Sequence, residues 1–101
     1  ITWIEWWGAM VVSPYKEYPT SNGFIRMFEP NVNESELVWH RDKKDRKVSV
    51  VKGKGWKFQM DNELPIDLKI GDVFEIKKNT FHRLHQGKDR LILHIKEYDG
   101  S

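Results

Sequence analysis

Two histidines and one aspartate in this chain have the residue types and the spacing of a metal site. His40 and Asp42 are separated by a single residue, and His82 follows forty positions after Asp42. On an extended segment, residues two apart point to the same face, so His40 and Asp42 can serve one site. Two imidazoles and one carboxylate form a facial triad that leaves other coordination positions for a substrate. Such a triad suits iron, manganese, nickel or zinc.

The segments that must position these residues have the alternation of β-strands. Apolar and polar residues alternate in four runs, at 48–50, 56–60, 74–76 and 91–95. Turn-forming residues separate the runs, and short strands at such intervals predict a sandwich or a barrel. Only residues 32–38 resemble a helix, and this stretch is short enough to be a loop. The sequence therefore predicts an all-β domain whose strands bring the three residues together.

Length and composition limit the classes of protein that fit. With 101 residues the chain forms one domain, residues 1–101, and it has no cysteine, so a metal needs nitrogen and oxygen ligands. Seventeen basic residues against fifteen acidic ones give a net charge of +2, which is too balanced to require a nucleic-acid or membrane partner. No apolar run is long enough to span a bilayer. We therefore expect a cytoplasmic protein whose partner is a small molecule.

Residues 34–98 resemble the two signature motifs of the cupin superfamily. The first motif consists of a glycine, a His-x-His pair, a glutamate and a second glycine. At these positions the chain has Glu34, His40, Asp42, Arg46 and Gly53. The second motif consists of a glycine, a proline, a glycine, a histidine and an asparagine. At these positions the chain has Gly71, Lys77, Asn79, His82 and Gln86.

The cupin resemblance implies a fold and a set of metal ligands. The fold is the cupin-type double-stranded β-helix, a jelly-roll barrel, which agrees with the strand pattern. Cupins commonly bind a divalent metal inside the barrel. By position, the implied ligands in this chain are His40, Asp42 and His82.

The resemblance also implies a division of the chain and an oligomeric state. We expect residues 34–98 to carry the barrel motifs and residues 1–33 to supply N-terminal strands and a dimer-forming segment. Cupins often dimerise by sharing strands, so we expect a homodimer. We expect Trp3, Trp6 or Trp7 to lose solvent exposure in this dimer.

Three further residues are candidates for substrate binding: Arg46, Arg83 and Trp56. Arginine stays protonated in proteins, so Arg46 cannot replace the glutamate of the motif as a metal ligand. Arg46 either clamps an anionic group of a substrate or pairs with Asp42 inside the barrel. Arg83 is a second candidate for holding the anionic group, and Trp56 is a candidate for the barrel mouth.

Three functional hypotheses follow from these residues. The first is a small cupin that binds a divalent metal and a small polar or anionic metabolite such as a sugar phosphate, with the metal as Lewis acid. The second is a metal-free, non-catalytic cupin that binds a ligand or serves as a dimeric accessory module. The arginine at position 46, where the motif has a glutamate, favours this second hypothesis. The third is an iron- and 2-oxoglutarate-dependent oxygenase in which Arg90 binds the co-substrate. The glycines at 53 and 71 fit the spacing of cupins better than that of such oxygenases.

Overall fold

The alternating runs of the sequence form strands. The computed structural model describes residues 15–30 and 39–98, and this part contains eight strands and no helix. In chain order they are β1 (Tyr15–Thr20), β2 (Gly23–Phe28), β3 (Asp45–Lys52), β4 (Lys57–Met60), β5 (Ile66–Asp67), β6 (Val73–Ile76), β7 (His82–His85) and β8 (Leu91–Tyr98). The prediction of an all-β fold is confirmed.

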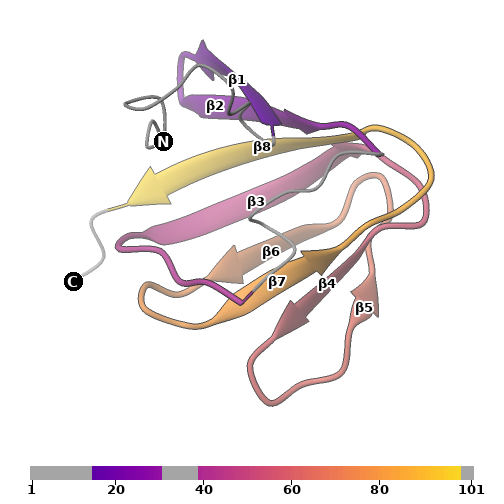
Figure 1. Cartoon of the computed structure of the whole chain (residues 1–101). Helices are drawn as coiled ribbons and strands as arrows, with labels where there is room; N and C mark the ends of the chain where they lie inside the picture. Colours follow the sequence, from indigo (N-terminus) through magenta and orange to yellow (C-terminus); the bar gives the residue numbers. More distant parts are fainter. Residues whose placement is uncertain (1–14, 31–38, 99–101) are drawn as a thin grey trace, which may run out of the picture.

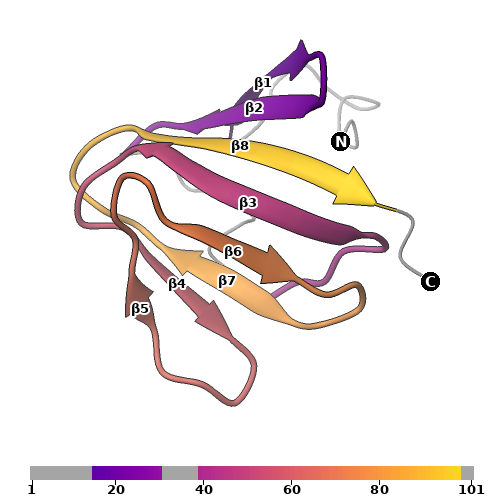
Figure 2. The same ribbon diagram turned by 180° about the vertical axis from the view of Figure 1, so that it is seen from behind.

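The strands form two antiparallel sheets (Figures 1 and 2). The larger sheet has five strands in the order β1-β2-β8-β3-β6, and the smaller has three in the order β5-β4-β7. Each sheet contains neighbours that are distant in sequence, since β8 lies between β2 and β3, and β7 pairs with β4. Such pairings bring motifs from separate parts of the chain to one place.

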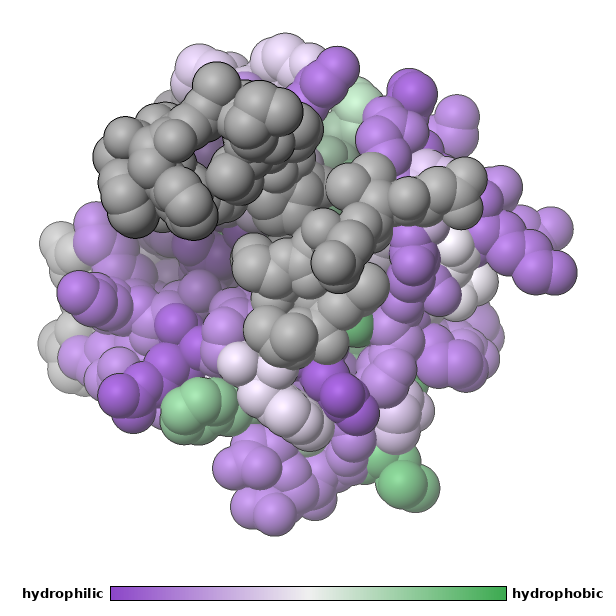
Figure 3. Space-filling view, in the orientation of Figure 1, coloured by the Kyte–Doolittle hydropathy of each residue, from purple (hydrophilic) through white to green (hydrophobic). Residues whose placement is uncertain are grey.

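The core fills the space between the two sheets. On β8, the residues Leu91, Leu93 and Ile95 are buried while the residues between them face the other side of the sheet. They join one hydrophobic cluster with residues of the smaller sheet, including Phe58 and Leu84. The face seen in Figure 3 is accordingly mostly hydrophilic outside its grey atoms, and its hydrophobic residues are isolated.

The long strands β3 and β8 define two opposite ends of the molecule. They are antiparallel, so Arg46 at the start of β3 lies opposite Glu97 near the end of β8. At the other end of β3, Lys52 lies opposite Ile92. Because a β-strand rises about 3.3 Å per residue, Arg46 and Lys52 are about 20 Å apart. Figure 1 shows β8 crossing the molecule between these ends.

Some predictions concern residues outside the described part of the chain. The possible helix at 32–38 lies there, as do Trp3, Trp6 and Trp7, so the predicted dimer segment stays a prediction. Within residues 15–30 and 39–98, no helix is long and apolar enough to cross a membrane.

Candidate metal centre

A direct backbone pairing joins the two segments that carry the predicted ligands. His40 and His82 form an isolated antiparallel bridge, in which each residue's N–H donates to the other's carbonyl at 3.0 and 2.8 Å. Residues directly opposite each other in such a pair place their side chains on the same face. Accordingly, the rings of His40 and His82 pack edge to face with centroids 4.4 Å apart.

A turn before β7 fixes the position of the aspartate. The backbone N–H of Asn79 donates to the carbonyl of Asp42 at 2.7 Å, and the N–H of Lys78 donates to the carboxylate of Asp45 at 2.7 Å. Asn79 has a φ of 61°, a left-handed conformation that asparagine tolerates better than most residues. The cupin motif has a glycine at this position, so the asparagine keeps the turn that the motif requires.

The three predicted ligands meet at one point. One ligand atom from each of His40, Asp42 and His82 lies within 4.8 Å of the others. His82 Nε2 lies 3.2 Å from Asp42 Oδ2. The opposite ring nitrogen of His82, Nδ1, lies 2.8 Å from the carbonyl oxygen of Thr80 and donates to it. This hydrogen bond orients the imidazole so that Nε2 faces Asp42.

The Asp42 carboxyl is ionised, and one of its oxygens has no hydrogen-bond partner. Burial acts to raise the pKa of Asp42, but the contact with His82 and the charges of Arg46 and the two histidines lower it below its ordinary value. Its Oδ2 atom is buried, and none of its contacts has the geometry of a hydrogen bond. A buried carboxylate oxygen in this state is an available ligand for a cation.

Arg46 occupies the position of the missing glutamate and is held mainly by Glu97. Nη2 and Nε of Arg46 lie 2.8 and 2.9 Å from Glu97 Oε2, whereas Nη1 lies 3.4 Å from Asp42 Oδ2. The structure thus contains the predicted Arg46–Asp42 pair as the longer of two ion pairs. Glu97 was missed in the sequence analysis, because its role depends on the register between β3 and β8.

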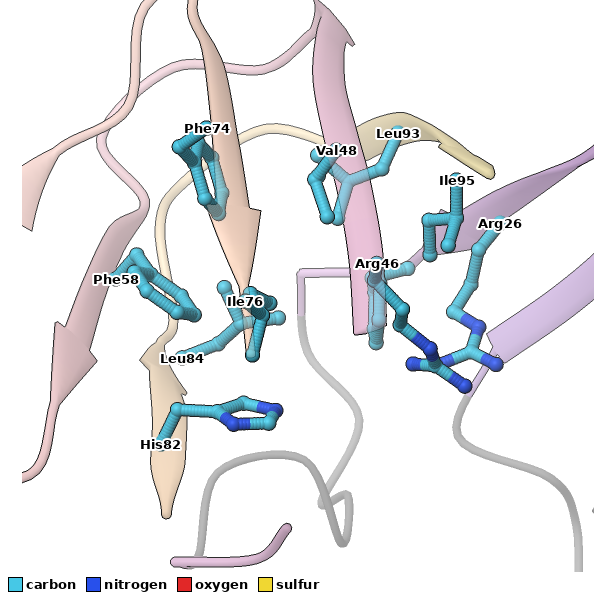
Figure 4. Close-up of a pocket in the computed structure, with 11 residues that line it drawn as sticks. Arg26, Arg46, Val48, Phe58, Phe74, Ile76, His82, Leu84, Leu93 and Ile95 are labelled. Atoms are coloured by element: carbon cyan, nitrogen blue, oxygen red, sulfur yellow. The ribbon is translucent and has the colours of Figure 1, made fainter. Parts of the chain in front are cut away.

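A narrow cavity extends from His82 into the space between the sheets. Its volume is about 30 Å³, and its walls are apolar apart from His82, Arg46 and Arg26. Figure 4 shows the ring of His82 turned toward the guanidinium of Arg46. The guanidinium carbons of Arg26 and Arg46 lie 5.3 and 5.9 Å from the centre of the Phe24 ring. The cavity therefore has a positively charged side next to the candidate ligands.

Arg26 is a second residue that the sequence analysis missed. It is only 6% exposed, its Nε donates to Glu17 Oε2 at 2.9 Å, and its guanidinium stacks on the Tyr15 ring at 3.9 Å. Side chains alternate between the two faces of β2, and Arg26 lies opposite the buried Leu93, so its side chain points inward. An arginine between apolar residues is the signal that could have identified it.

The structure does not support the predicted binding role of Trp56 and places Arg83 away from the cavity. Trp56 is 0% exposed and its indole N–H donates to the carbonyl of Asp89, so it has no surface to offer a ligand. Arg83 donates to Gln59 and stacks on Trp39, on the opposite face of the small sheet from His82. Neither residue lines the cavity.

Arg90 is also distant from the candidate ligands. It forms an exposed ion pair with Glu29 at 3.0 Å, on the loop that leads into β8, and it does not line the cavity. The oxygenase hypothesis required this side chain to bind a co-substrate beside the metal. Arg90 therefore does not fill the role that this hypothesis gave it.

Comparison with solved structures identifies the class of fold. No protein-family model matches the chain, and no curated protein matches it significantly in sequence. A candidate mannose-6-phosphate isomerase from Ralstonia eutropha is similar with a TM-score of 0.62 and 14% identity, over 85% of this chain and 83% of that one. A cupin domain from Bordetella pertussis has a TM-score of 0.58 and 12% identity, over 87% and 98%.

A third similar structure is a cupin protein from Bacteroides fragilis, with a TM-score of 0.59 and 16% identity over 97% of this chain and 89% of that one. These likenesses show that the chain has the cupin fold, a double-stranded β-helix, as the motif resemblance implied. Within that fold it carries a cluster of two histidines and an aspartate that can hold a metal ion.

Proposed function

We propose that the protein binds a divalent transition-metal ion through His40, Asp42 and His82. The observation that carries the proposal is the 3.2 Å contact between His82 Nε2 and Asp42 Oδ2. Because Nδ1 of His82 donates to Thr80, Nε2 is directed at the carboxylate, and either a metal ion or a proton between Nε2 and Oδ2 makes the contact favourable. Neighbouring ligands of an ion with bonds of about 2.1 Å lie roughly 3 Å apart. The contact fits that spacing.

The charges around the three ligands are compatible with a dication. Arg46 would repel a metal ion, but Glu97 accepts two contacts from its guanidinium and offsets its charge. Asp42 then adds one negative charge to two neutral imidazoles. A donor set of nitrogen and oxygen atoms suits iron, manganese, nickel or zinc.

We further propose that the ligand of this site is a small carboxylate. The cavity of about 30 Å³ beside the proposed ligands has room for one or two water molecules, so any organic ligand must extend beyond it. Its two arginines, Arg46 and Arg26, already pair with the carboxylates of Glu97 and Glu17, and a carboxylate ligand would compete with these glutamates for the same planar donors. The apolar walls exclude water and so strengthen such pairing. A bound metal supplies a Lewis acid that polarises a carbonyl or carboxylate oxygen.

A metal-free ligand-binding module is the second candidate function. The observation that favours it is the 3.4 Å contact between Arg46 Nη1 and Asp42 Oδ2. In that case a proton on His82 Nε2 takes the place of the metal, and His82 and Arg46 both neutralise Asp42. The two candidates therefore differ in what lies between His82 and Asp42.

Metal binding by purified protein distinguishes the two functions. Protein prepared without chelator or nickel resin is analysed for metal content and then titrated with manganese, ferrous iron, nickel and zinc. We expect one ion per chain, and an increase in the free energy of unfolding of about 2.7 kcal/mol when the free ion is at 100 times its Kd. The absence of uptake from all four ions would favour the metal-free module.

Variants assign the binding to the proposed ligands. His82→Ala and Asp42→Asn should lose metal uptake while the protein stays folded, as checked by circular dichroism. His94→Ala is the matched control, because His94 contacts Thr20 on the outer face of the large sheet and should bind the metal normally. Unchanged stoichiometry in both site variants would remove the triad from the proposal.

A further inference from the structure

The end of the molecule opposite the candidate metal centre contains a basic groove. Two adjoining hollows, of about 610 and 840 Å³, share the loop between β3 and β4 and the residue Asp89. We call them together the lysine groove and define it by its charged residues, which are Lys52, Lys54, Lys69, Lys88, Asp67 and Asp89. Three segments far apart in the sequence supply these side chains.

Positive charge in the lysine groove is only partly compensated. The four lysines are exposed, and none of them forms an ion pair with another residue of the described ranges 15–30 and 39–98. Of the two acids, Asp67 already pairs with Lys57 at 2.5 Å. Asp67 and Asp89 therefore oppose four ammonium groups, and Asp67 is shared with Lys57, in a chain whose overall charge is only +2.

The segments that carry the lysines are fixed to one another. A Cβ on Gly87 would lie 2.5 Å from the backbone nitrogen of Trp56 and 2.6 Å from the carbonyl carbon of Gly55, so only glycine permits this close approach. The buried Trp56 also donates from its indole to the Asp89 carbonyl at 2.6 Å. Its own carbonyl accepts from the N–H of Leu68 at 2.9 Å. Trp56 thus ties all three segments together.

We propose that the lysine groove binds a small metabolite that carries a diphosphate or triphosphate group. Lysine ammonium groups bind phosphate oxygens as point charges, and four of them match a ligand with several negative charges. Both hollows are open to solvent, so such a ligand would be held mainly through its charged groups. Ile70, which is 68% exposed beside Lys69, offers an apolar wall to the uncharged part of such a ligand. The packing around Trp56 already holds the loops of the groove in place, so less conformational entropy is lost when a ligand binds.

This site is independent of the metal centre, because it lies at the opposite end of β3 and shares no residue with it. Its test therefore uses metal-free protein. Amide chemical shifts are followed by NMR at 0.15 M salt during titration with orthophosphate, pyrophosphate and tripolyphosphate. We expect saturable binding whose affinity rises in that order, with shifts concentrated in residues 52–55, 67–70 and 86–89.

Charge reversal separates a built site from general attraction of anions. Lys54→Glu combined with Lys88→Glu should weaken tripolyphosphate binding at least tenfold. Lys16→Glu combined with Lys47→Glu makes the same change of charge on the large sheet, outside the groove, and should weaken it less than twofold. Equal weakening in the two double variants, or no saturation below millimolar concentrations, would overturn the proposal. Tighter binding of single-stranded DNA than of tripolyphosphate would also overturn it, in favour of a nucleic-acid surface.

Discussion

The two ends of the molecule handle charge in opposite ways. At the metal centre the charged side chains are largely buried, and each has a partner: His82 and Arg46 contact Asp42, and Glu97 contacts Arg46. At the lysine groove the charges are exposed and mostly unpaired, while the backbone beneath them is closely packed around Trp56. Buried charges are strongly destabilising without partners, whereas exposed lysines are hydrated. The metal centre therefore depends on paired side chains, and the groove depends on the packing of its base.

The largest effect that tests this contrast is a loss of stability at the groove end. Gly87→Ala places a methyl group within 2.6 Å of Trp56 and Gly55, so the loops must move apart. We expect the free energy of unfolding, measured with urea, to fall by roughly 1–3 kcal/mol. Gln86→Ala, at the exposed neighbouring position, is the control and should change it by less than about 0.5 kcal/mol. A similar result for both variants would show that the loops are not closely packed.

A smaller effect is expected at the metal end, on affinity. Glu97→Gln removes the countercharge of Arg46, so the guanidinium repels a bound dication more strongly. We expect the Kd for the metal to rise about tenfold, the lower limit for residues that orient or neutralise ligands. Isothermal titration calorimetry measures the change.

Two controls accompany the Glu97 variant. Glu97→Asp keeps the charge and should recover most of the affinity, while Glu75→Gln removes an exposed carboxylate of the same large sheet and should leave it unchanged. An unaltered Kd in Glu97→Gln would mean that Arg46 does not act on the site. That result would weaken the contrast between the two ends.

The smallest effect is a pH dependence on the outer face of the small sheet. Burial, together with the positive charges of Arg83 and Lys57, lowers the pKa of His85 below its ordinary value. The folded state thus binds fewer protons there than the unfolded state. The contribution of His85 to stability is present in full above about pH 6.5 and falls as the pH decreases through the lowered pKa.

The measurement compares wild-type protein with His85→Gln, which still permits a polar contact with Gln59. Between pH 8 and pH 5 the free energy of unfolding should fall more in the wild type than in the variant. Equal slopes would show that His85 is fully hydrated. The effect is small because this side chain is only partly buried.

Sequence reasoning succeeded where the information was local. Alternation identified β3, β4, β6 and β8, and the motif positions identified the three residues that meet at the bridge between His40 and His82. Proximity of these residues is observed, while their role as metal ligands stays a prediction.

Glu97 and Arg26 could not be found in this way, because their positions depend on which strands pair and in which register. Arg46 faces Glu97 only because β8 lies beside β3 with that alignment. Trp56 was assigned to the barrel mouth. The alternation at residues 56–60 predicts which face of the strand a side chain is on, but it does not predict how far that side chain is buried. Its complete burial depends on two distant loops that close over it.

The isolated bridge between His40 and His82 has a consequence for folding. Two backbone hydrogen bonds join these segments directly, although His40 and His82 are forty-two positions apart in the sequence. An ion held by both segments would act as a removable crosslink, closing a long loop whose closure is otherwise opposed by chain entropy. Since the unfolded chain has no preformed site, this crosslink forms only after the segments have met. Chelation would then loosen the 39–42 segment first, ahead of the sheets.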